Sequence, residues 1–239
     1  MPTTNGMRRL AILAFHKIGE PSIPEWKTWS YIAEDRFADY LEWPAESGWR
    51  LLRLHALLHG LADPDSLPGR SLLLTFDDGY KSMRSIALPW LKRFGYPAVM
   101  FVPTEFIGGR NDFDNGIEPE EVICDWDDLR DLDGHGVSIQ SHSASHRGFS
   151  TLPSADLEFE LFRSKATLEI GLQRPVEFLA YPYGDGGADQ ELVENMLDRA
   201  GYRAACLYGG GPNSIPVTNP FRLMRIAMGP DTDLERELA

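Results

Sequence analysis

The sequence has few cysteines, a deficit of basic residues and no long apolar run. Its two cysteines, Cys124 and Cys206, lie far apart, which excludes a disulfide framework and a zinc-finger pattern. Lys and Arg number 23 against 36 Asp and Glu, and the resulting net charge of −13 disfavours a nucleic-acid partner. No run of 18 apolar residues occurs, so we expect no membrane-spanning helix. The remaining composition is ordinary for a globular domain.

The apolar run near the N-terminus is short. It follows Arg8 and Arg9 and ends at His16 and Lys17, whereas a signal peptide has a longer apolar core and a small-residue cleavage site. We interpret residues 10–15 as a buried strand and expect a cytoplasmic location, with a role at the cell envelope left open.

Short apolar runs alternate with longer helical patterns along the chain. The runs predict strands buried on both faces at 10–15, 71–76, 98–102, 137–140, 178–181, 203–206 and 223–227. Helical spacing of apolar residues predicts helices at 28–49, 51–61, 81–94, 126–132, 154–171 and 190–200. This alternation predicts one α/β domain over residues 1–239, with a mostly parallel sheet in a closed or nearly closed barrel. Residues 108–121 are expected to form a flexible insertion.

Two adjacent carboxylates follow the strand predicted at 71–76. Asp77 and Asp78 precede Gly79, which permits a tight turn. The carboxyl ends of parallel strands share one face, where active sites lie. One carboxylate can therefore bind a metal while the other reaches a water. The alternative is a helix N-cap before residues 81–94.

The strand predicted at 137–140 leads into a loop with two histidines. His142 and His146 are four positions apart, a spacing that brings two imidazoles to one face of a helical turn and is common among metal ligands. Neutral imidazoles suit zinc, cobalt, nickel or iron. An incidental pair of histidines in a polar loop is the alternative.

Together these residues fit a metal-dependent acyl hydrolase. Asp78, His142 and His146 would form a two-His-one-carboxylate site, and such sites polarise an acyl carbonyl and acidify water. Asp77 would be the general base that takes a proton from the attacking water.

Two further residues are candidates for the remaining roles. The Pro- and Gly-containing turn at 181–185 would present the backbone N–H of Tyr183 to the developing oxyanion, with an ordinary loop as the alternative. His16 ends the strand predicted at 10–15 and is the candidate general acid for the leaving amine. A satisfied histidine at a strand terminus is its alternative.

Three segments carry a resemblance to a known family. TFDDGY (75–80), SHSASH (141–146) and YPYG (181–184), in this order, resemble the motifs of the polysaccharide deacetylases of carbohydrate esterase family four. The similarity extends from about residue 10 to about residue 235. The resemblance implies an irregular, incomplete (β/α) barrel.

The resemblance also implies an activity and its residues. It implies a hydrolase that removes acetyl groups from N-acetylated sugars of a polysaccharide or oligosaccharide, cleaving amide bonds other than peptide bonds. The family's base falls on Asp77, and its metal ligands fall on Asp78, His142 and His146. The metal is commonly zinc, with iron, nickel and cobalt as alternatives.

The sequence departs from the common family pattern at one position. Many members have arginine two positions before the proline of the third motif, where this chain has Ala180. Arg225 is a candidate replacement, with an ordinary ion pair as its alternative. The segment ILAFHKIGE (12–20) resembles the branch that acts on poly-N-acetylglucosamine exopolysaccharide, in which a histidine after an N-terminal strand is the acid, and this favours His16.

Two other functions stay open. Similar enzymes hydrolyse cyclic imides, ureides or formyl amides, and a closed pocket would favour such small substrates. An open groove with aromatic walls would favour an acetylated glycan as partner; Trp26, Trp29 and Trp43 are candidates for stacking on sugars, although tryptophan is more often buried in a core. A catalytically degraded carbohydrate-binding domain is the third function, supported only by Ala180. The sequence makes no prediction about the oligomeric state.

Overall fold

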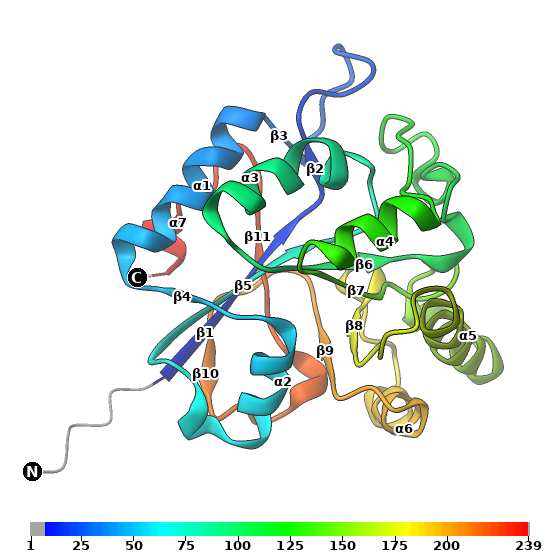
Figure 1. Ribbon diagram of the computed structural model, residues 1–239. Coiled ribbons are helices and arrows are strands. Elements are labelled where there is room, and N and C mark those ends of the chain that lie inside the picture. The colour runs from blue at the N-terminus through cyan, green and yellow to red at the C-terminus, as the bar shows by residue number, and fades with distance from the viewer. Residues whose placement is uncertain (1–7, 239) are drawn as a thin grey trace, which may run out of the picture.

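The structure is a computed structural model that describes residues 8–238. Within these residues, nine strands form one curled sheet, a half barrel with helices around its outside (Figure 1). Along the sheet the order is β10 (Asn213–Ile215), β1 (Arg8–Phe15), β5 (Arg70–Phe76), β6 (Ala98–Val102), β7 (Val137–Ser141), β8 (Phe178–Ala180) and β9 (Ala204–Cys206). β4 (Arg50–Leu51) pairs with β5, and β11 (Ile226–Ala227) pairs with β1. Every pair is parallel except β1 with β10. The predicted incomplete (β/α) barrel is confirmed.

The helices are α1 (Glu34–Ser47), α2 (Leu54–Ala62), α3 (Leu88–Phe94), α4 (Trp126–Gly134), α5 (Ser154–Leu172), α6 (Gln190–Ala200) and the short α7 (Leu234–Glu237). Most of them follow one another around the outside of the sheet, whereas α2 packs against the other face (Figure 1). Among the helices of residues 8–238, none is long and apolar enough to cross a membrane.

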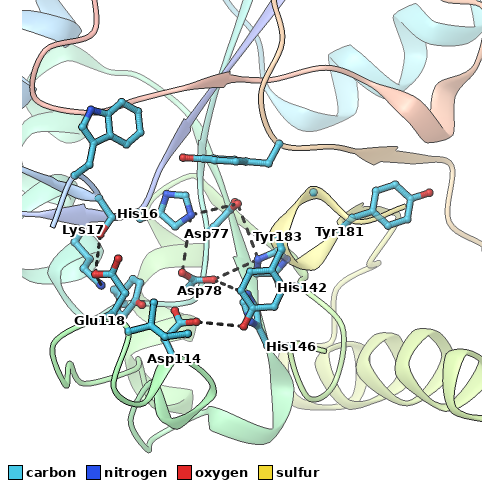
Figure 2. Close-up of a pocket in the computed structure, with 16 residues that line it drawn as sticks. His16, Lys17, Asp77, Asp78, Asp114, Glu118, His142, His146, Tyr181 and Tyr183 are labelled. Carbon is cyan, nitrogen blue, oxygen red and sulfur yellow. Dashed lines mark hydrogen bonds and ion pairs between the residues drawn. The ribbon is translucent and has the colours of Figure 1, made fainter. Parts of the chain in front are cut away.

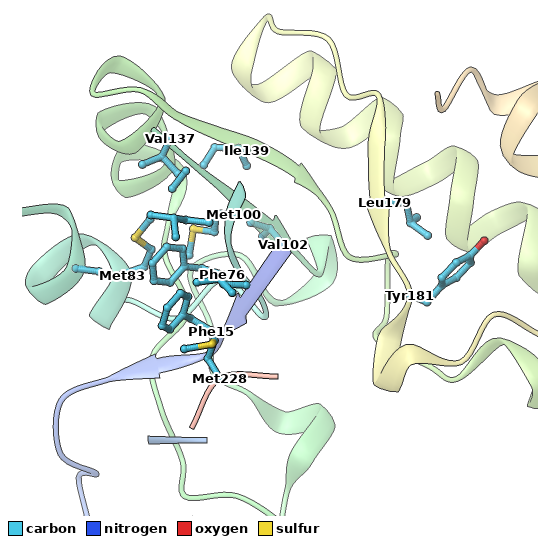
Figure 3. Packing of buried hydrophobic residues seen from close by; sticks show 14 of the residues in the cluster. Phe15, Phe76, Met83, Met100, Val102, Val137, Ile139, Leu179, Tyr181 and Met228 are labelled. Atoms are coloured by element: carbon cyan, nitrogen blue, oxygen red, sulfur yellow. The ribbon is translucent and has the colours of Figure 1, made fainter. Parts of the chain in front are cut away.

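The strands are apolar throughout because both of their faces are buried. In β1, Leu13 and Phe15 belong to the cluster beneath the outer helices, whereas Leu10 and Ile12 belong to a second cluster on the other face. Phe15 stacks on Phe76 of β5 with ring centroids 5.2 Å apart, and Figure 3 shows this pair within the larger cluster. This burial on both faces explains the unbroken apolar runs in the sequence.

Three sequence predictions differ most in extent from the structure. The helix predicted at 28–49 begins only at Glu34, because Tyr31–Ile32 (β3) instead pairs with Lys17–Ile18 (β2). The helix predicted at 81–94 consists of a π-helical turn over Met83–Ala87 followed by α3, whose second residue, Pro89, has no N–H for the preceding turn.

The third difference concerns the end of the chain. The strand predicted at 223–227 is reduced to β11, and Arg225 lies immediately before it. Leu223 makes only an isolated bridge to Cys206, so these residues cross from one strand to another instead of extending a single strand.

The parallel register brings the chemically interesting residues to one edge of the sheet. Phe15 pairs with Phe76, so His16 and Asp77 are the next residues of adjacent strands. Val102 pairs with Ser141, and His142 follows directly. All three side chains therefore start from the same end of the half barrel.

Candidate active site

A cavity of about 380 Å³ opens at this end of the half barrel (Figure 2). The residues that line it include all six of the sequence-predicted catalytic and metal-binding candidates: His16, Asp77, Asp78, His142, His146 and Tyr183. They come from the ends of β1, β5, β7 and β8. The structure therefore brings together residues that are far apart in the sequence.

The two carboxylates diverge because the chain turns sharply between them. Asp78 and Gly79 both have left-handed backbone conformations, with φ of 68° and 77°. A side chain at position 79 would lie 3.2 Å from Ile123 and 3.3 Å from Val102, so the turn requires glycine for space as well as for conformation. Neither carboxylate caps the next helical turn, whose N-cap residue is Ser82. The helix-cap alternative is therefore not supported.

Asp78, His142 and His146 form a buried cluster whose ligand atoms lie within 4.8 Å of one another. Oδ1 of Asp78 is 3.3 Å from Nε2 of His142 and 3.1 Å from Nε2 of His146. This oxygen is buried and has no aligned hydrogen-bond donor within residues 8–238. Tetrahedral ligands at about 2.0–2.1 Å from an ion lie about 3.3 Å apart, so these three residues fit a divalent metal.

The electrostatics of the cluster are consistent with this fit. Burial alone would raise the pKa of Asp78, but the imidazoles of His142 and His146 outweigh it and hold that pKa well below its usual range. Nδ1 of His142 lies 2.8 Å from the carbonyl oxygen of Ala180, and donating this hydrogen bond leaves Nε2 free as a ligand atom.

The histidine loop is not the helical turn that the i, i+4 spacing suggested. Ser143 and His146 have φ of 66° and 59°, both left-handed, so the loop is not a right-handed helical turn. Glu160 of α5 accepts hydrogen bonds from the backbone N–H groups of Ala144 and Ser145, both at 2.8 Å, and from the Ser145 hydroxyl. This buried carboxylate holds the loop that carries both histidines.

Asp77 forms a bidentate ion pair with Arg225. The two guanidinium nitrogens lie 2.6 and 2.7 Å from the two carboxylate oxygens, and both side chains are buried. Burial alone would raise the pKa of Asp77, but Arg225, His142 and His16 outweigh it and lower that pKa below its ordinary value. Asp77 is therefore ionised at neutral pH. Its guanidinium partner is Arg225, from the C-terminal part of the sequence, and not a residue at position 180.

His16 faces both carboxylates from the end of β1. Its Nε2 lies 3.9 Å from Asp77 Oδ2 and 4.0 Å from Asp78 Oδ2. The ring meets Tyr208 edge-on at 5.3 Å, and Nδ1 has no hydrogen-bond partner within the described chain. The interpretation of His16 as a satisfied strand-end histidine therefore does not fit its surroundings.

Tyr183 lies in a short 3₁₀ turn after β8 and has a left-handed backbone, with φ of 57°. Its exposed ring packs against His146 with centroids 4.6 Å apart, and its hydroxyl lies 3.2 Å from Oδ1 of Asp114. Burial and the nearby Asp78 raise the pKa of Asp114.

Sequence reasoning missed several residues of the pocket wall: Lys17, Asp114, Glu118 and Tyr208. Two of them belong to the segment 108–121, which was expected only to be a flexible insertion. The position of Lys17 immediately after His16 was an available signal. Of the three candidate tryptophans, Trp29 lines the pocket and is half exposed, whereas Trp43 packs against the core.

The fold and the site define an α/β half-barrel protein with a candidate metal site next to an ion-paired carboxylate. The chain belongs to the polysaccharide deacetylase family, which matches residues 65–205, more than half of its length. The resemblance inferred from the three motifs is therefore confirmed.

Two curated relatives are distant and longer than this chain. YxkH of Bacillus subtilis (strain 168), named provisionally as a polysaccharide deacetylase, is 23% identical over 176 residues, 74% of this chain and 57% of that protein. The poly-β-1,6-N-acetyl-D-glucosamine N-deacetylase of Escherichia coli (strain K12) is 26% identical over 121 residues, 48% of this chain and 18% of that protein. The chain thus spans less than two thirds of either relative.

Two solved structures share the fold over nearly the whole chain. The Streptococcus pyogenes deacetylase PplD in complex with acetate superposes with a TM-score of 0.83 at 20% identity, covering 98% of this chain and 99% of that one. IcaB from Ammonifex degensii gives 0.79 at 20% identity, covering 94% and 93%.

Proposed function

We propose that this protein hydrolyses the acetamido group of N-acetylglucosamine residues in a polysaccharide, using a divalent metal held by Asp78, His142 and His146. The observation that carries the proposal is the buried Asp–His–His cluster beside the Asp77–Arg225 pair, in a chain of the polysaccharide deacetylase family. The sugar is taken from the printed activity of the Escherichia coli relative. Zinc is the first candidate metal, with iron, nickel or cobalt as alternatives.

In this proposal each residue of the site has one role. A divalent ion in the cluster would polarise the acetyl carbonyl and lower the pKa of a water. Asp77, kept ionised and oriented by Arg225, accepts the proton of the attacking water. The backbone N–H of Tyr183 donates to the developing oxyanion. His16 protonates the leaving amine through Nε2, the nitrogen that faces the carboxylates.

The other two functions have less support. The cavity has exposed aromatic side chains on its wall, Trp29 and Tyr183, which suit the apolar face of a sugar ring better than a small imide. The argument for a degraded binding domain rested on Ala180, and Arg225 now supplies the missing guanidinium to Asp77.

The test combines elemental analysis of the purified protein with acetate release from β-1,6-linked N-acetylglucosamine oligomers, before and after chelation. We expect about one metal per chain and acetate release that stops with chelator and returns with zinc. Metal without acetate release would redirect the search to small amides, and absence of both after reconstitution would contradict the proposal.

A further inference from the structure

The pocket contains a second polar cluster that the proposed reaction does not use. Lys17 follows His16 in the chain, and it is only 2% exposed, so its charge is buried. Its Nζ lies 2.7 Å from Oε2 of Glu118 and over the rings of Tyr31 and Tyr80, 4.8 and 4.7 Å from their centroids. A buried ammonium with one carboxylate and two ring faces around it is fixed in position.

Glu118 is held through only one of its two oxygens. Oε2 accepts hydrogen bonds from Lys17 and from the hydroxyls of Thr28 and Ser30, the latter two at 2.5 and 3.1 Å. Oε1 accepts no hydrogen bond from residues 8–238, although the side chain is 18% exposed and lines the pocket. Figure 2 shows Lys17 and Glu118 on the opposite side of the pocket from His146 and Tyr183. Glu118 thus offers a rigid acceptor oxygen across from the candidate metal site.

The charge and the surroundings of this cluster indicate its ligand. Because Lys17 neutralises Glu118, the cluster favours a hydroxyl donor of a neutral sugar over a free cation. Trp29 lies between Thr28 and Ser30 in the chain, lines the same pocket and is 45% exposed. An apolar ring and a fixed acceptor in the same pocket match the two kinds of surface that a sugar ring presents.

We propose that Glu118 is a specificity-determining residue that accepts hydrogen bonds from the hydroxyl groups of the acetylated sugar, and that Lys17, Thr28 and Ser30 position it. This inference rests on the proposed function and gives a physical reason why the enzyme would prefer glycans to small amides. A substrate without hydroxyls leaves the carboxylate oxygen desolvated and unpaired, and sites of this kind discriminate strongly against such analogues.

The test compares a substrate that has hydroxyls with one that lacks them. The kcat and KM values are measured for a β-1,6-linked N-acetylglucosamine tetramer and for p-nitrophenyl acetate. The variants are Glu118→Gln and the double variant Lys17→Met/Glu118→Leu, which leaves no buried charge without its partner. Glu120→Gln is the matched control, because this carboxylate is in the same segment, is 63% exposed and pairs with Arg110.

In both Glu118 variants we expect a higher KM for the tetramer and a fall of about 10- to 100-fold in the ratio of the two kcat/KM values, tetramer over ester. Glu120→Gln should keep the wild-type ratio. An unchanged ratio in folded Glu118 variants overturns the assignment. An equal loss of kcat on both substrates with KM unchanged also overturns it, because that pattern marks a structural role.

Failure of the wild-type protein to release acetate from any glycan would instead overturn the proposed function. Calorimetric binding of the tetramer to the wild-type and Glu118→Gln proteins then decides the recognition role on its own. Weaker binding by the variant supports that role, and equal binding overturns it.

Discussion

At the scale of single residues, the site depends on how its buried charges are matched. Asp77 is only 2% exposed, so solvent stabilises its charge little, and Arg225 contacts both of its oxygens. A general base is useful only if it is ionised when water attacks, and the guanidinium secures this at the cost of some basicity. A metal-acidified water would compensate for that weaker base.

The pairing predicts a large loss of stability when only one partner is removed. Arg225→Met leaves the Asp77 carboxylate buried without a cation, which should lower the free energy of unfolding by about 3–5 kcal/mol. The double variant Asp77→Asn/Arg225→Met should recover part of the loss, because no buried charge is left unpaired. Urea unfolding of the wild type and both variants provides the measurement. Equal stability of the single variant and the wild type would contradict the argument.

His16 should matter for the leaving group and not for the metal. We expect His16→Gln to slow acetate release from N-acetylglucosamine oligomers by about 100- to 10,000-fold, the usual contribution of a general acid. Turnover of p-nitrophenyl acetate should fall far less, because p-nitrophenolate leaves without a proton. His55→Gln, at an exposed position of α2, is the control. A loss of metal in the His16 variant would reassign this residue as a ligand.

At the scale of elements, one helix holds the loop that carries two of the candidate metal ligands. Glu160 of α5 accepts hydrogen bonds from two backbone N–H groups in the segment between His142 and His146. The left-handed residues in this loop, including His146 itself, have a conformation that L-residues avoid. The contact with α5 therefore stabilises a backbone that the loop sequence alone does not favour.

This contact predicts a metal-binding defect from a residue that is not itself a ligand. Glu160→Ala should weaken zinc affinity by about 10- to 100-fold, the usual effect of removing a group that orients metal ligands. Competition titration with a chromogenic chelator measures it. Glu158→Ala is the matched control, since Glu158 is a partly exposed carboxylate on the same helix that pairs with Arg199. Equal affinities in the two variants would show that α5 does not preorganise the loop.

The sequence predicted the positions of these groups better than their conformations. Asp77, Asp78 and His142 were predicted to converge because apolar strands in parallel order place their ends on one edge. The conformation of the histidine loop was not predictable, because it depends on Glu160, which is 15 positions from Ser145 and on a different element. The Lys17–Glu118 pair was missed for the same reason, since its partners are 101 positions apart.

Arg225 was proposed only through the family resemblance. Nothing in its local sequence identifies Asp77 as its partner, 148 positions away. The fold makes the contact when residues 223–227 cross from a bridge with Cys206 to pairing with β1. The prediction of a continuous strand at 223–227 was therefore wrong at Arg225. The chain passes from one strand to another at this residue, and the guanidinium reaches Asp77 inside the half barrel.

At the scale of the whole molecule, a metal in the cluster would link the ends of two strands that are not direct neighbours in the sheet. Asp78 follows β5, and the two histidines follow β7, with β6 between these strands. Binding to the native state alone stabilises it by about 4 kcal/mol when the free ion is at 1,000 times its Kd. For a chain of this size, the melting temperature should therefore rise by roughly 8–16 °C with saturating zinc relative to chelated protein.

The increase in melting temperature caused by zinc should become smaller as the pH is lowered. Burial alone would lower the pKa of His142, but Asp78 and Asp77 outweigh it and raise that pKa above its ordinary value of 6.5 in the metal-free protein. A raised histidine pKa stabilises the metal-free fold at low pH, and this contribution is lost as pH rises through the folded-state pKa. A metal requires neutral imidazole, so its contribution has the opposite dependence. The difference in melting temperature between zinc-bound and chelated protein should therefore be largest in mildly alkaline buffer. As the pH is lowered, this difference should begin to decrease before the pH reaches 6.5. Melting curves with zinc and with chelator from pH 8 to pH 5 measure this difference in melting temperature. The His142→Ala variant should show no difference at any pH. A difference that increases toward pH 5 would place the bound ion away from His142.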